Sequence, residues 1–184
     1  MKTKFAVVCL ALVAMSVPLL MAGSKDPMVG GAPMYASKDI IDNAVNSKDH
    51  TTLVAAVKAA GLVDTLKGAG PFTVFAPTNQ AFAKLPAGTV ETLLKPENKE
   101  MLTKILTYHV VAGRISSAEL KKRIREGHGQ ATLKTVSGGT LIAMMQGNAI
   151  VLKDEKGGMS TVTIPNVFQS NGVIHVVDTV VMPN

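Results

Sequence analysis

Residues 70–82 read Gly-Pro-Phe-Thr-Val-Phe-Ala-Pro-Thr-Asn-Gln-Ala-Phe, and this stretch decides the fold. An apolar strand can run from Phe72 as far as Pro77, which has no backbone N–H to continue a strand ladder. Thr78 follows, and its hydroxyl suits the N-cap of a helix. Pro77 and Phe82 then stand at the two positions that form a hydrophobic staple. The stretch therefore predicts a strand that turns directly into a helix.

Helical patterns dominate the sequence around this stretch, both before it and shortly after it. The strongest covers about Glu97 to Val110, where Glu97 and Glu100 favour the helix N-terminus and the apolar residues form one stripe. Other helices are predicted after Ser37 as N-cap, from about Thr52 to Gly61, over residues 62–66, and within residues 85–94.

The second half of the chain is predicted to form strands. Short apolar segments at 131–133, 141–144, 150–152 and 162–164 are separated by glycine-containing turns. Asn171-Gly172 supplies a tight turn into a last segment, 173–181, that is apolar on both faces. Such a strand belongs in the middle of a sheet or sandwich. Helices followed by hairpins predict an α+β domain.

Two segments, 70–82 and 171–178, resemble the signature boxes of the fasciclin (FAS1) family, and Tyr108-His109 lies between them as in that family. The resemblance covers roughly Asp39 to Pro183. It implies N-terminal helices packed around a β-wedge or sandwich formed largely by the C-terminal half. The residues that carry it are Pro71, Phe72, Thr73, Phe75, Pro77, Thr78, Asn79, Phe82, Asn171, Gly172, His175 and Asp178.

The resemblance also implies a non-catalytic adhesion module that binds a cell-surface or matrix protein or a polysaccharide. Its candidate binding residues are Tyr108, His109, Pro165, Asn166, Val167 and Phe168. In some animal family members, a Glu-Pro-Asp-Ile-Met-like stretch before the second box carries integrin-binding activity. Here Asn166 stands at the aspartate position, and a neutral amide is a weaker ligand for a hard cation. Integrin-type recognition is therefore not expected.

Two of these candidates have competing interpretations. His109 lies on the apolar stripe of its helix, so we expect a buried, neutral, hydrogen-bonded residue near the Pro77–Asn79 turn rather than a recognition residue. Phe168 is either an exposed anchor for a partner or a core residue like Val167.

Enzymatic chemistry finds little support in the sequence. His175 and Asp178 are three apart on a predicted strand, so their side chains should face opposite sides and form no catalytic pair. The histidines lack zinc-type spacing, and no cofactor motif occurs. We expect the methionines within the domain to fill core space.

The N-terminus predicts export. Lys2 and Lys4, the apolar run of residues 5–20 and the small residues that follow it are typical of a signal peptide, assigned to residues 1–24. Residues 25–36 are rich in glycine and proline and predict a flexible linker before a single domain at 37–184. The mature chain is therefore expected to be secreted, extracellular or periplasmic, without an integral membrane segment.

The formal net charge of +6 is mild, and its basic residues are scattered without interleaved aromatic residues. This pattern is compatible with an anionic surface and argues against nucleic acid. A secreted or periplasmic carrier for a lipid or polysaccharide is the alternative function. The sequence gives no indication of the oligomeric state.

Overall fold

The computed structural model describes residues 26–184, so the predicted signal peptide lies outside the described part of the chain. The helices are α1 (Ile40–Ala44), α2 (Thr51–Ala60), α3 (Val63–Lys67), α4 (Asn79–Ala83), α5 (Thr89–Leu93), α6 (Lys99–Tyr108) and α7 (Ser117–Glu126), with 3-10 turns η1 (Lys48–His50) and η2 (Pro96–Asn98). The strands are β1 (Met28–Val29), β2 (Ala32–Pro33), β3 (Phe72–Pro77), β4 (Val110–Ala112), β5 (Gln130–Lys134), β6 (Thr140–Gln146), β7 (Ala149–Lys153), β8 (Met159–Gln169) and β9 (Gly172–Val177).

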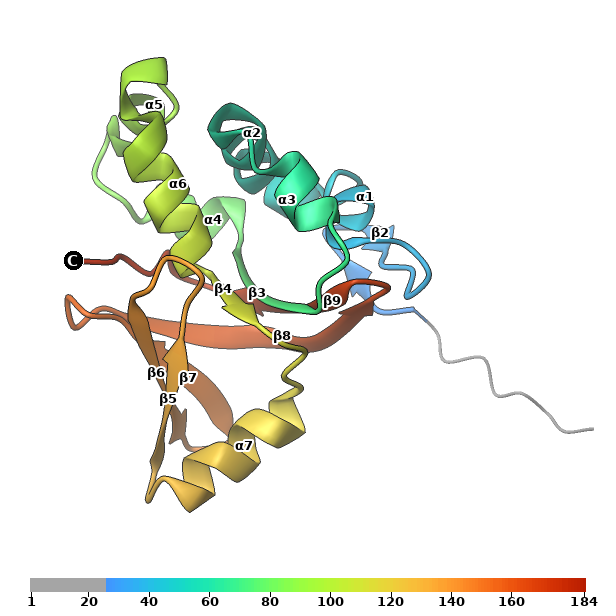
Figure 1. Ribbon diagram of the computed structural model, residues 1–184, viewed down its shortest axis with the longest axis vertical. Helices are drawn as coiled ribbons and strands as arrows, with labels where there is room; N and C mark the ends of the chain where they lie inside the picture. Colours follow the sequence, from blue (N-terminus) through green and yellow to red (C-terminus); the bar gives the residue numbers. More distant parts are fainter. Residues whose placement is uncertain (1–25) are drawn as a thin grey trace, which may run out of the picture.

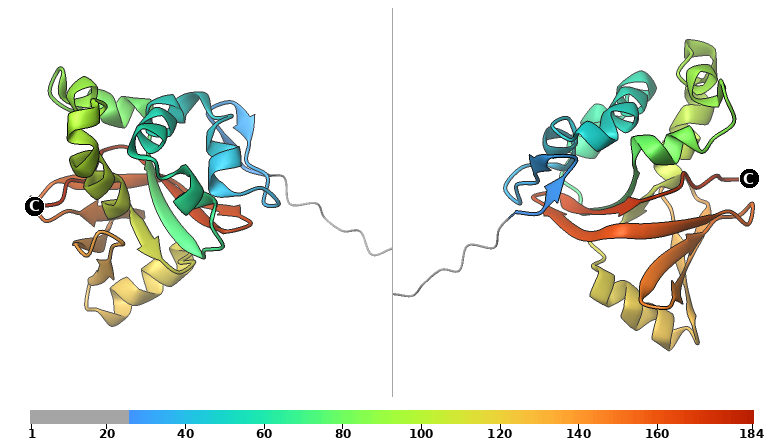
Figure 2. Two further views of the ribbon diagram at one scale, coloured as in Figure 1. Left: turned by 45° about the horizontal axis from the view of Figure 1, so that its top comes forward. Right: turned by 180° about the vertical axis from the view of Figure 1, so that it is seen from behind.

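The main sheet has seven strands in the order β4-β3-β9-β8-β7-β6-β5. Helices α1 to α6 lie on one side of β3, β9 and β8, whereas α7 lies on the other side beside β5, β6 and β7 (Figure 1). The view from behind shows the same order: helices α1 to α6, then strands β3, β9 and β8, then α7 with β5 to β7 (Figure 2). This arrangement confirms the α+β prediction.

The sheet curls until its two outer strands meet. Val111 of β4 pairs with Thr135 in an isolated bridge, and the amide of Val136 donates to the Val110 carbonyl at 2.8 Å. Closure of this kind satisfies backbone groups that an open sheet would leave exposed at its edges. The sheet is therefore a wedge-shaped, barrel-like structure with an interior of its own.

Two hydrophobic cores result from the alternation of side chains along the central strands. Val74 and Val176 face the helices and belong to the first core, whereas Phe75 and Val177 face the interior of the curled sheet and belong to the second. Every residue of β9 is buried because β3 (parallel) and β8 (antiparallel) flank its two edges and the two cores cover its two faces. The predicted central position of this strand is confirmed, although it ends at Val177 rather than at residue 181.

The stretch at 70–82 folds as its sequence predicts. Strand β3 ends at Pro77, and the Thr78 hydroxyl accepts a hydrogen bond from the Ala81 amide at 3.2 Å at the start of α4. Gly61 ends α2 in the left-handed conformation, with φ of 72°. The predicted cap at Ser37 is wrong: Asp39 caps α1 instead, accepting from the Asp42 amide at 2.8 Å.

The expectation of a flexible linker over residues 25–36 is also wrong. Residues 28–33 form the short hairpin β1–β2, and Val29 and Met34 are 3% and 2% exposed within the first core. The Gly30 carbonyl accepts a hydrogen bond from the Lys48 amide at 3.1 Å, which fixes the hairpin turn to η1. Composition alone predicted a linker, because strands of two residues are too short to show the alternation of apolar and polar residues that marks a strand.

Candidate functional site

The Tyr108-His109 pair ends α6 and enters the sheet at β4. The Tyr108 side chain is fully buried, and its hydroxyl donates to the Thr140 carbonyl at 2.6 Å and accepts from the Glu155 amide at 3.2 Å. Burial raises the pKa of this phenol to about 12. Tyr108 therefore joins α6 to the first residue of β6 and to the turn between β7 and β8, inside the second core.

His109 is a second buried link, this time to the C-terminal segment. Its Nδ1 lies 2.9 Å from the Ile105 carbonyl, and its Nε2 accepts from the Val181 amide at 3.2 Å. Nδ1 therefore carries the proton of a neutral ring. Burial lowers the pKa of this imidazole to about 4, which keeps it neutral at physiological pH.

These positions correct two expectations about the pair. Tyr108 and His109 are 0% and 3% exposed, so their side chains cannot contact a partner in this conformation. The predicted burial of His109 is confirmed, and the lowered pKa is consistent with a neutral ring, but its ring partners are Ile105 and Val181 and not the Pro77–Asn79 turn. The first signature box meets it through the backbone instead, where the Phe75 amide donates to the His109 carbonyl at 2.9 Å.

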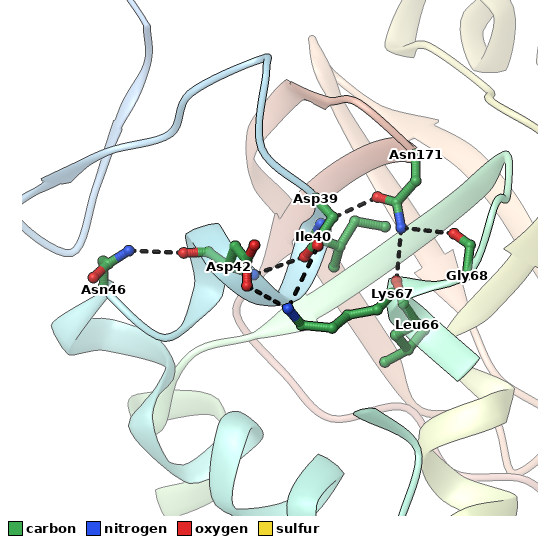
Figure 3. Close-up of polar contacts among 8 residues, drawn as sticks. All are labelled: Asp39, Ile40, Asp42, Asn46, Leu66, Lys67, Gly68 and Asn171. Atoms are coloured by element: carbon green, nitrogen blue, oxygen red, sulfur yellow. Dashed lines mark hydrogen bonds and ion pairs between the residues drawn. The ribbon is translucent and has the colours of Figure 1, made fainter. Parts of the chain in front are cut away.

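Asn171, at the start of the second signature box, clamps two helices together (Figure 3). Its Oδ1 accepts from the Ile40 amide at the first turn of α1, at 3.1 Å. Its Nδ2 donates to the carbonyls of Leu66 and Gly68 at the end of α3, at 2.7 and 3.1 Å. One amide thus satisfies a free N–H at a helix start and free carbonyls at a helix end. This role explains why the position requires both a donor and an acceptor.

His175 and Asp178 point to different partners, in agreement with the prediction that they form no catalytic pair. The imidazole Nε2 of His175 donates to the Ile115 carbonyl at 2.8 Å, and its Nδ1 accepts from the Asn166 amide at 3.2 Å. Asp178 accepts from the Thr161 amide at 2.8 Å. Both residues therefore hold β9 to its neighbours.

Residues 165–168, the candidate binding residues before the second signature box, belong to the long strand β8. The pairing of β8 with β9 shifts register between Val162 and Ile164 and again between Ile164 and Val167. Asn166 has a positive φ of 61°, a conformation that asparagine tolerates better than most residues. These irregularities bend the strand and change the direction of its side chains.

The side chain of Asn166 is occupied within the protein. Its Oδ1 accepts from the Ser117 amide at 2.8 Å, and its Nδ2 donates to the Ser117 hydroxyl at 2.7 Å, so it fixes the start of α7. Asn166, which stands where some family members have a cation-binding aspartate, therefore binds the first residue of α7, and Ser116 is the N-cap of that helix.

The remaining candidates divide between core and surface. Val167 is 1% exposed and packs in the first core, whereas Pro165 and Phe168 are exposed, Phe168 to 41%. Arg114, which sequence reasoning missed, donates from its guanidinium to the carbonyls of Gln169 and Ser170 at 2.8 and 2.9 Å. We call the exposed residues Arg114, Pro165 and Phe168 the Phe168 surface. It combines one aromatic side chain, one cation and a backbone held by hydrogen bonds.

Residues 26–184 contain no group of three or more His, Cys, Asp or Glu side chains placed to hold a metal ion. No helix among the same residues has the length and apolar character needed to cross a bilayer.

Comparison with known proteins identifies the family. Residues 48–183 match the Fasciclin domain. The chain belongs to the fasciclin family. It is 45% identical to Protein sll1483 of Synechocystis over 163 residues, which cover 86% of this chain and 81% of that protein. It is 39% identical to Immunogenic protein MPT70 of Mycobacterium tuberculosis, over 76% of this chain and 66% of that protein.

A surface protein and a solved structure extend the comparison of this fasciclin-family protein. Cell surface glycolipoprotein MPB83 of Mycobacterium bovis is 31% identical to it, over 84% of this chain and 64% of that protein. A FAS1 domain pair from the insect cell adhesion molecule Fasciclin I matches with a TM-score of 0.68 at 19% identity, over 77% of this chain and 50% of that one. The predicted FAS1-like fold is therefore confirmed.

Proposed function

We propose that this fasciclin-family protein is an exported, non-catalytic module that binds a cell-surface or matrix protein or polysaccharide through the Phe168 surface. The observation that carries the proposal is the 41% exposure of Phe168 on a strand that pairs with β9 and whose next carbonyls accept hydrogen bonds from Arg114. A large aromatic side chain on a rigid support can bury much apolar area with little loss of conformational entropy. The names of the relatives, a cell surface glycolipoprotein and an insect cell adhesion molecule, support the same setting.

Phe168→Ala tests this proposal against a matched control. Met159 is on the same strand and is 47% exposed, so Met159→Ala removes a comparable exposed side chain away from the Phe168 surface. We expect Phe168→Ala to lose binding to immobilised envelope or matrix fractions while its free energy of unfolding falls by only about 1 kcal/mol. Met159→Ala should keep both. Equal binding by the two variants would exclude Phe168 as the anchor.

Export is the second part of the proposal. The succession of Lys2 and Lys4, an apolar run and small residues supports cleavage between Gly23 and Asp26. N-terminal sequencing of protein recovered outside the cytoplasm checks this expectation. Recovery of a chain that retains Met1 in a membrane-integral form would contradict it.

A further inference from the structure

An internal cavity lies between the helices and the face of β3 and β9. Its volume is about 40 Å³, and side chains from β1, α1, α2, β3, β9 and the start of β4 line it. Among the lining residues only Ser47, His50 and His109 are polar. A closed cavity of this size holds a few water molecules at most, so a larger guest requires one wall to move.

His50 brings an unsatisfied polar atom to this apolar cavity. The residue is 4% exposed, and its Nδ1 lies 2.8 Å from the Ser47 hydroxyl. Its Nε2 has no hydrogen-bond partner among residues 26–184; the Ala76 carbonyl lies nearby and favours ring protonation, but it does not meet hydrogen-bond geometry. Burial nevertheless lowers the pKa of the imidazole, so the ring is neutral at pH 7. A buried polar atom without a hydrogen-bond partner lowers the stability of the folded state. A single polar group of this kind in an apolar pocket is typical of a ligand-binding site.

The hairpin β1–β2 forms the wall that is easiest to move. It contributes Val29, and Met34 follows directly after it. Each strand of the hairpin has two residues, and the main connections to the helices are the Lys48–Gly30 backbone hydrogen bond and the pair of hydrogen bonds between the Asn43 side chain and the Tyr35 backbone. Because few hydrogen bonds hold it and Val29 and Met34 are its buried apolar side chains, this segment should open at a lower free energy than the sheet.

We infer that the cavity is a binding site for an uncharged single-chain amphiphile with a hydroxyl head, such as a long-chain alcohol, and that the hairpin is its lid. The alkyl chain takes the space that Val29 and Met34 occupy, and the hydroxyl bonds Nε2 of His50. A hydroxyl fits either tautomer of His50, because it both donates and accepts. A carboxylate head fits poorly, since no cationic side chain lines the cavity to offset the cost of burying its charge.

Isothermal titration of the full chain with 1-decanol tests the site. We expect saturable binding to the wild type, tighter binding to Met34→Ala because the lid is smaller, and roughly tenfold weaker binding to His50→Phe, the loss of one hydrogen bond. Decanoate at pH 7 should bind more than tenfold more weakly than 1-decanol. Absence of saturable binding in both the wild type and Met34→Ala would overturn the inference.

Two alanine-to-leucine variants locate the ligand. Ala44 lines the cavity, so Ala44→Leu fills it and should abolish binding; Ala59 is exposed on α2, so Ala59→Leu should leave binding unchanged. Equal affinity of the two variants would place the ligand elsewhere. Phe168→Ala should bind 1-decanol like the wild type, which separates this site from the Phe168 surface.

Hydrogen exchange tests the lid without a substitution. The Lys48 amide is protected by its bond to the Gly30 carbonyl, so it should exchange faster when 1-decanol saturates the protein. Unchanged protection of this amide at saturation would show that the hairpin does not open, and the lid would be refuted.

Discussion

Asn171→Ala should be among the most destabilising single substitutions in this protein. The change removes three hydrogen bonds, to the Ile40 amide and to the carbonyls of Leu66 and Gly68, and the bonds to Ile40 and Leu66 are buried. Each buried group left without a partner costs about 1–3 kcal/mol, and the more accessible Gly68 carbonyl costs less because water can replace the amide. We therefore expect a loss of about 3–5 kcal/mol in the free energy of unfolding.

Urea unfolding at pH 7, followed by circular dichroism, measures this loss. Asn46 supplies the control (Figure 3). Its Nδ2 also donates to a helix carbonyl, that of Asp42 at 2.7 Å, but this hydrogen bond lies at the surface. Asn46→Ala should cost less than about 0.5 kcal/mol because both groups remain hydrated. Asn171→Asp should be at least as destabilising as Asn171→Ala, since it places an oxygen opposite two carbonyls. A cost below about 1 kcal/mol for Asn171→Ala would refute the clamp.

Three further outcomes follow from the buried residues. The lowered pKa of His109 means that, as pH falls, the unfolded chain takes up a proton on this residue before the folded chain does. The free energy of unfolding should therefore fall by up to about 3 kcal/mol as pH drops from 6.5 to about 4. The same pH dependence in a His109→Gln variant would contradict this. Tyr108→Phe should cost about 1–2 kcal/mol in urea unfolding through the lost bonds to Thr140 and Glu155, and a neutral result would show that these bonds contribute no net stability. Val29→Ala should cost about 1–3 kcal/mol in thermal unfolding, whereas a true tether would tolerate it.

Local signals account for the parts of the fold that the sequence predicted correctly. The Pro77-Thr78 junction and the Gly61 cap depend on residues within one turn of one another. The central position of β9 followed from a strand that is apolar on both faces. In each case the decisive chemistry lies inside a short window, so a single sequence is sufficient to detect it.

The errors concern contacts between distant segments. From the sequence, the inference about Asn166 was only that it lacks the carboxylate of a cation ligand. In the fold, its side-chain amide forms hydrogen bonds with Ser117, which is distant in sequence. The burial of Tyr108 depends on Thr140 and Glu155, and that of Val29 on its position against the helices. Nothing in the neighbouring sequence marks these partners, because they meet only in the tertiary fold.

The pairing of β3 with β9 has a consequence for how the chain is made. Thr73 lies opposite Val173, so the centre of the sheet joins two segments that the ribosome makes far apart in time. Until that last strand emerges, β3 and β8 lack the neighbour that buries them, and contacts this distant form slowly. Nascent chains should therefore remain loosely folded until β9 has emerged, and a stop codon before Gly172 would yield a product that proteases degrade readily.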